Sequence, residues 1–130
     1  MLLDLPAPTL RAYRPEAVIA EKFQAMVMLG RANSRMKDFY DIWVLSRSHT
    51  FAGDELARAV RATFDRRSTQ IPSDAPDCLT AEFAGDAAKL QQWSSFVADV
   101  ATKPGSLADV VADLGAFLMP HAVAARKIGS

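Results

Sequence analysis

Prolines and glycines divide this 130-residue chain into segments that each have the apolar spacing of an amphipathic α-helix. The first segment opens at Pro15, because proline is tolerated at the first helical position and the acid that follows complements the helix dipole. Gly30 supplies the end of this helix. The turn at 32–34 offers N-cap side chains for a second helix that runs to about Arg47.

A third helix is predicted at about 54–67, where apolar residues recur at i, i+3, i+4 and i+8. A loop containing two prolines follows at 68–80. The fourth helix covers about 86–102, with a short turn at 80–84 before it. Its expected buried face consists of Leu90, Trp93, Val97 and Val100.

The last predicted helix begins after the Pro104-Gly105 break, where Ser106 and Asp109 resemble a capping box. Pro120 should stop or kink this helix, and the tail at 126–130 should fray.

The expected fold is therefore all-α: a single bundle of about five helices over residues 15–126. Residues 1–14 contain Pro6 and Pro8 and show no helical period, so we expect an extended lead-in that could form an edge strand.

Composition narrows the class of protein. Half of the residues are hydrophobic, and 15 basic residues balance 15 acidic ones, so net charge gives no indication of nucleic-acid binding. Lysine and arginine exceed acids by three in residues 1–67. This excess is small, so RNA binding by this half is the least supported of the hypotheses considered for this chain. The single cysteine and the lack of a signal peptide or a membrane-length apolar run predict a cytoplasmic protein.

Lys22 is the first exception to the amphipathic pattern. Its neighbours three and four residues away are all apolar, so the ammonium group emerges from a core-facing stripe. A lysine in this setting either binds a defined anion or forms a structural salt bridge, with Glu16, Asp38 or Asp41 as the possible partners. The pattern alone favours the salt bridge.

Asp38 and Asp41 are the second exception, because Asp38 falls on the buried face of the second predicted helix. Two carboxylates at this spacing can bind a divalent cation or position a proton. Alternatively, they complement the helix N-terminus while Arg35 and Lys37 neutralise them.

We expect these charges to meet, because a short turn joins their two helices. A lysine and two aspartates beside further cations form a polar pocket suited to phosphate chemistry. His49 and His121 have no partners at ligand spacing, so no metal site is predicted.

Residues 13–42 resemble the AbiEii/AbiGii toxin family of nucleotidyltransferases. The family shows an "EK" helix followed by an "R-x-KD-x-x-D" helix start, and this sequence has Glu21-Lys22 and then the stretch 35–41. Two later stretches, 62–64 and 92–93, resemble a subgroup with a longer helical tail.

The resemblance implies a polymerase-beta-like domain joined to a helical one, and transfer of a nucleotide from an NTP with Mg²⁺ to an acceptor such as RNA. It assigns Lys22 to the nucleotide phosphates, and it makes Asp38 and Asp41 the acidic site residues. Arg35 and Lys37 then match the basic, substrate-binding positions. An antitoxin partner is also implied, and no cofactor should bind this chain tightly.

The family's earlier "GSxxxR" and "DxD" motifs are missing. No two acidic residues are separated by one position, and neither Gly-Ser pair is followed by the required arginine. Since two-metal transfer needs clustered carboxylates, we expect a truncated, C-terminal helical part that is inactive without an N-terminal half. The alternative is a non-catalytic helical module that interacts with itself or another protein, with the same charges as a structural ion pair.

Overall fold

The computed structural model describes residues 14–33 and 35–128, and all the regular structure in these ranges is helical. The predicted all-α class is confirmed. The expected lead-in at 1–14 lies outside the described residues except for Arg14, which is extended.

Six α-helices lie within the described residues, and five of them have eleven residues or more. They are α2 (Pro15–Leu29), α3 (Met36–Ser48), α4 (Glu55–Arg66), α5 (Ala81–Gly85), α6 (Ala87–Val97) and α7 (Leu107–Lys127), with 3₁₀ turns at Gly30–Ala32 and Asp77–Leu79.

The connection from α2 to α3 decides where the candidate site residues lie. Gly30 ends α2 with a φ of 56°, a left-handed conformation that glycine adopts without a Cβ clash. Asn33 then accepts a hydrogen bond from the Arg35 amide through Oδ1, at 2.8 Å. These two features reverse the chain, so that α3 packs back against α2.

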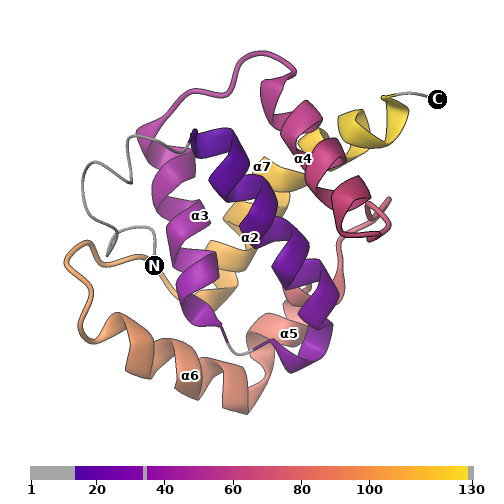
Figure 1. Cartoon of the computed structure of the whole chain (residues 1–130). Helices are drawn as coiled ribbons and strands as arrows, with labels where there is room; N and C mark the ends of the chain where they lie inside the picture. The colour runs from indigo at the N-terminus through magenta and orange to yellow at the C-terminus, as the bar shows by residue number, and fades with distance from the viewer. Residues whose placement is uncertain (1–13, 34, 129–130) are drawn as a thin grey trace.

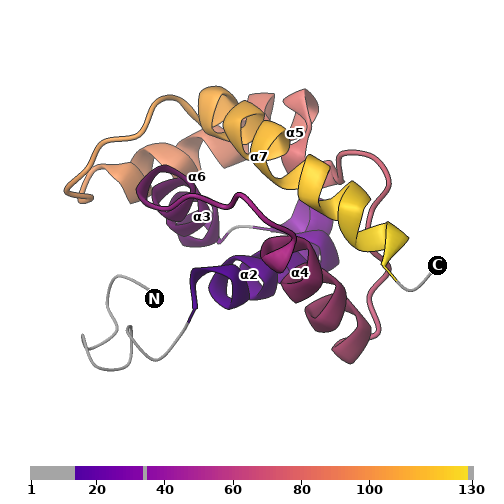
Figure 2. The ribbon, with the colours of Figure 1, turned by 90° about the horizontal axis from the view of Figure 1, so that it is seen from above.

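The helices surround one core (Figures 1 and 2). Helix α2 packs most extensively against α4 and also against α3, whereas α7 packs against α3, α4 and α5. In both views α7 lies on the side of the molecule opposite α2.

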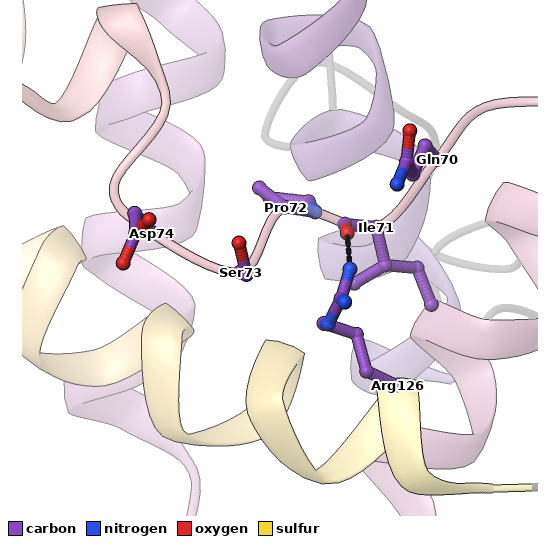
Figure 3. Close-up of a pocket in the computed structure, with 6 residues that line it drawn as sticks. All are labelled: Gln70, Ile71, Pro72, Ser73, Asp74 and Arg126. Carbon is purple, nitrogen blue, oxygen red and sulfur yellow. Dashed lines mark hydrogen bonds between the residues drawn. The ribbon is translucent and has the colours of Figure 1, made fainter. Parts of the chain in front are cut away.

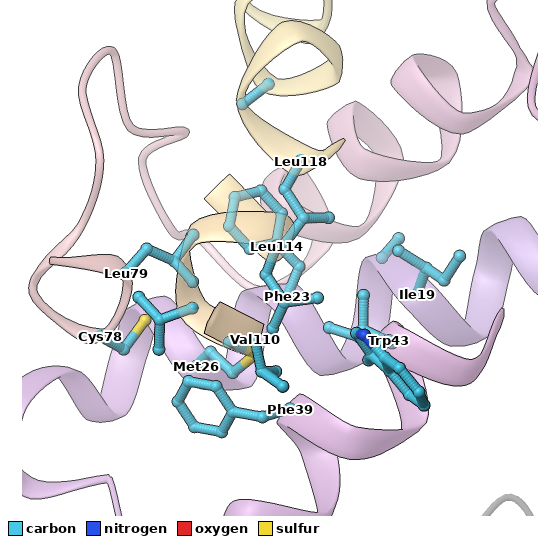
Figure 4. Close-up of a cluster of buried hydrophobic side chains, with 14 of the residues drawn as sticks. Ile19, Phe23, Met26, Phe39, Trp43, Cys78, Leu79, Val110, Leu114 and Leu118 are labelled. Carbon is cyan, nitrogen blue, oxygen red and sulfur yellow. The ribbon is translucent and has the colours of Figure 1, made fainter. Parts of the chain in front are cut away.

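Large apolar side chains from four separate segments fill the interior (Figure 4). Phe23 of α2, Phe39 of α3 and Leu114 of α7 are fully buried. Rings of Phe23 and Phe64 lie 5.4 Å apart, and those of Phe39 and Phe83 lie 5.6 Å apart. Both tryptophans are buried, as their positions on apolar faces predict.

The predicted extent of α6 was wrong, and so was the placement of Leu90 on its buried face, whereas Trp93 is buried and Val97 packs against the core. Asp86 is extended and caps α6 through its side chain, which separates α5 from α6. Lys103 donates to the carbonyls of Val97 and Ala98, closing the helix five residues before the predicted end. Leu90 is 43% exposed, whereas its neighbour Lys89 is buried.

Pro120 was expected to stop or kink α7, and it does not stop the helix. Pro120 is exposed, and the helix continues through it to Lys127. The supposedly frayed tail at 126–127 is helical. Because α7 is continuous, it is long and apolar enough to cross a membrane by length and composition alone. In its apolar 18-residue stretch, 33% is buried inside the protein. A core helix of a globular domain meets the same criterion.

Candidate functional site

The residues that the sequence singled out come together between α2 and α3. Lys22 Nζ lies 3.1 Å from Asp38 Oδ1 and 3.1 Å from Asp41 Oδ2. The spacing of the aspartates, three residues apart on one helix, places both carboxylates on the side that faces α2. The predicted convergence of the lysine with the aspartates is confirmed.

Two further cations complete the cluster from α3 and its N-terminus. Arg35 Nε lies 3.0 Å from Asp38 Oδ2, and Lys37 Nζ forms an ion pair with Asp41 Oδ2. Three cations thus surround two carboxylates, leaving one net positive charge. Glu16, an alternative partner for Lys22 in the sequence, instead pairs with Arg14.

Exposure divides the cluster into a buried floor and an open rim. The side chain of Asp41 is fully buried and that of Asp38 nearly so, whereas the side chains of Lys22 and Arg35 are 16% and 57% exposed. Lys37 is partly buried. The acids therefore lie below the cations, and an approaching molecule meets positive charge first.

This arrangement fits an anion better than a metal ion. Both carboxylates already have cationic partners, and the described residues contain no group of three or more His, Cys, Asp or Glu side chains that could hold a metal. Asp41 Oδ1 is buried without a hydrogen-bond partner among the described residues. Lysine and arginine at a partly open surface are the residues that bind phosphate oxygens.

A buried lysine that sequence analysis missed supports this cluster. Lys89 Nζ donates to the backbone carbonyl of Asn33 at 2.7 Å, across 56 residues of sequence. Asn33 in turn fixes the amide of Arg35. Helix α6 thereby holds the connection that leads into α3. No sequence signal marked it out, because the polar residues Asp86, Gln91 and Gln92 lie close to it along the chain.

A separate cleft lies between the 70–74 loop and the end of α7 (Figure 3). Arg126 donates from its Nη1 to the carbonyl of Ile71 at 2.7 Å and so ties the loop to the helix. Gln70, Pro72, Ser73 and Asp74 complete the lining. This cleft contains none of the predicted site residues.

The remaining reactive side chains are poor candidates for catalysis. Burial raises the pKa of the Cys78 thiol to about 12, so it is not a thiolate nucleophile at neutral pH. Burial also lowers the pKa of His121, which stacks edge-on against Phe117. Neither residue contacts the Lys22 cluster.

Comparison with known proteins identifies the family. Residues 1–115 match the family model described as nucleotidyl transferase AbiEii toxin, type IV TA system, a match that includes the whole Lys22 cluster. Searches of curated proteins and of solved structures gave no match. Since the family model covers most of the 130 residues, the chain belongs to the AbiEii family of nucleotidyl transferase toxins of type IV toxin–antitoxin systems.

Proposed function

We propose that this chain is the helical part of a nucleotidyltransferase toxin that transfers a nucleotide from an NTP to an acceptor, with RNA as the candidate acceptor. The observation that carries the proposal is the convergence of Lys22 with Asp38 and Asp41 beneath a partly open cationic rim. Family membership supplies the reaction class.

Each residue of the cluster then has a distinct role. Lys22, Lys37 and Arg35 bind the NTP phosphates, which carry the charge that grows during phosphoryl transfer. Asp38 and Asp41 hold the lysine ammonium groups in position, since their ion pairs leave little freedom to the side chains. Mg²⁺ would neutralise the phosphates in the complete enzyme, but the described carboxylates do not fit as its ligands.

The metal ligands and the phosphate-binding turn are therefore proposed to come from a segment beyond these 130 residues. The sequence contains no acidic pair of the "DxD" type and no Gly-Ser turn followed by arginine at the family spacing. We infer that transfer needs that segment, and that a cognate antitoxin counteracts the toxin, as expected in a type IV system.

Nucleotide binding is the direct test. Titration of the ¹⁵N-labelled chain with each of the four NTPs should shift the amide resonances around Lys22 and at the start of α3. Lys22→Met should weaken binding at least tenfold, since a charge-assisted hydrogen bond contributes about 1.5–3 kcal/mol. The matched control is Lys127→Met, which removes one lysine at the far end of α7.

The burial of Asp41 favours a second candidate, a non-catalytic helical module in which the cluster is a structural ion pair. If this second function is correct, none of the four NTPs should shift the amide resonances around Lys22, while Lys22→Met should still destabilise the fold. Shifts that are the same in the unmodified chain and in Lys22→Met would also contradict the nucleotide site.

A further inference from the structure

Lys89 in α6 is a buried lysine without an acidic partner. The residue is 8% exposed, and among the described residues its Nζ contacts only the carbonyl of Asn33, at 2.7 Å, and the ring of Phe83, 5.3 Å from the centroid. Burying a charge without an opposite charge costs free energy. Lys89 also lies in the first turn of α6, where a positive charge opposes the helix dipole. The benefit of this lysine therefore lies at the carbonyl that it binds.

That carbonyl belongs to the connection between α2 and α3. Asn33 also accepts a hydrogen bond from the Arg35 amide, through Oδ1 at 2.8 Å. Arg35 has a φ of −86° and a ψ of 71°, close to the centre of an inverse γ-turn and outside the helical region. Its carbonyl accepts from the Asp38 amide at 3.0 Å, but its own amide depends on Asn33. Helix α6, which packs beside α3 (Figure 1), thus fixes the backbone of Arg35 through Lys89.

The side chain of Arg35 is anchored at one nitrogen only. Its Nε lies 3.0 Å from Oδ2 of the almost fully buried Asp38, while 57% of the Arg35 side chain is exposed. No described residue pairs with its two terminal nitrogens. A guanidinium held in this way presents two parallel N–H donors, the geometry that binds a phosphate group through two hydrogen bonds. The direction of these donors follows from the backbone of Arg35.

We propose that Lys89 is a positioning residue for phosphate binding, because through Asn33 it holds Arg35 with its terminal nitrogens toward an incoming phosphate. The inference rests on the proposed nucleotide site and adds to it a residue from α6, outside the "EK" and "R-x-KD-x-x-D" motifs. Lys89 itself does not touch the phosphate. Its loss should weaken binding by releasing Arg35, while every group that contacts the ligand is still present.

The ¹Hε–¹⁵Nε resonance of Arg35 tests the positioning without any ligand. In the unmodified chain it should be sharp, because the ion pair with Asp38 slows exchange of this proton with water. Lys89→Met keeps the apolar stem but cannot donate to Asn33, so it should shift and broaden the resonance. Lys103→Met is the matched control, since Lys103 also donates to backbone carbonyls, at the other end of α6. It should leave the resonance unchanged, and circular dichroism checks that each variant is folded.

Titration with inorganic triphosphate tests the effect on binding, because this ion carries the phosphate charge without base or sugar. Lys89→Met should weaken binding about three- to tenfold, the equivalent of one ordinary hydrogen bond, while Lys103→Met should not weaken it. Arg35→Lys keeps the charge but loses the paired donors, so it should weaken binding too. Lys89→Met/Arg35→Lys should bind no more weakly than Arg35→Lys, because Lys89 acts through Arg35.

The results separate this inference from the proposed function. If the unmodified chain binds neither triphosphate nor any NTP, the nucleotide site is contradicted, and the role of Lys89 in phosphate binding with it. If triphosphate binds, the nucleotide site stands, and three results would each overturn the positioning role alone. These are an Arg35 resonance that Lys89→Met leaves unchanged, additive losses in the double variant, and an Arg35→Lys chain that binds as tightly as the unmodified one. The last result does not require Lys89→Met to fold.

Discussion

Glu21 and Lys22 are adjacent on α2, yet they enter two charge clusters of different character. Glu21 points toward α4, where it pairs with Arg66 and Arg67, and Arg67 Nη2 lies 2.9 Å from its carboxylate. All three side chains are more than a third exposed. Lys22 points toward α3 and pairs with two buried acids.

The difference shows that ion-pair geometry alone does not decide how much a charged side chain contributes to the stability of the fold. Both clusters contain contacts near 3 Å, but water screens the Glu21 cluster and competes for its hydrogen bonds. In the Lys22 cluster, two carboxylates are shielded from water, so each carboxylate is stabilised by its neighbouring cations and not by solvent. Adjacent residues should therefore respond very differently to loss of charge.

Lys22→Met should have the largest effect. The substitution keeps the length and the apolar stem of the side chain but leaves Asp38 and Asp41 with one cation each. We expect the free energy of unfolding to fall by about 3 kcal/mol, the lower end of the cost of breaking a buried ion pair, because Arg35 and Lys37 remain. Urea denaturation followed by circular dichroism measures this change.

Lys127→Met serves as the control for Lys22→Met, since it removes an exposed lysine and should change stability by about 0.5 kcal/mol or less. Equal losses for the two substitutions would contradict the distinction between the clusters.

Asp41→Asn should have an intermediate effect. The amide has nearly the same shape, but it no longer neutralises Lys22 and Lys37. Lys37 can extend into solvent and Lys22 retains Asp38, so we expect a loss of about 2 kcal/mol, within the range for removing a hydrogen bond to a charged group. Denaturation of the double variant Lys22→Met/Asp41→Asn completes a double-mutant cycle, whose coupling energy measures the interaction between these two residues. Strict additivity would show that the two residues do not interact in solution.

The sequence predicted the Lys22 cluster because its pattern is local. Lysine among apolar neighbours and two aspartates on a buried face are visible within 20 residues, and the short turn at Gly30 leaves few ways to arrange α2 and α3. The family motif, "EK" followed by "R-x-KD-x-x-D", falls in the same segment and strengthened the prediction.

Features that depend on distant contacts were not predictable. The burial of Lys89 and the exposure of Leu90 could not be predicted from the apolar pattern of α6, because Lys89 finds its partner at Asn33, 56 positions away. The end of α6 depends on the Lys103 side chain capping two carbonyls. Pro120 was expected to stop or kink α7, but the helix continues to Lys127, since α7 packs against α3, α4 and α5 and tertiary packing outweighs local helix preference.

Glu21→Gln should have the smallest effect, although it removes two close ion pairs with arginine. Both arginines reach water without Glu21, so no charge is left desolvated, and exposed pairs contribute about 0.2–1 kcal/mol. In 1 M salt, where the screening length falls to about 3 Å, even this difference should disappear, whereas the effect of Lys22→Met should persist because water and ions do not reach Asp41. Parallel urea titrations at low and high salt separate the two responses. A Glu21→Gln loss as large as that of Lys22→Met, unchanged by salt, would mean that burial does not determine the strength of these two clusters.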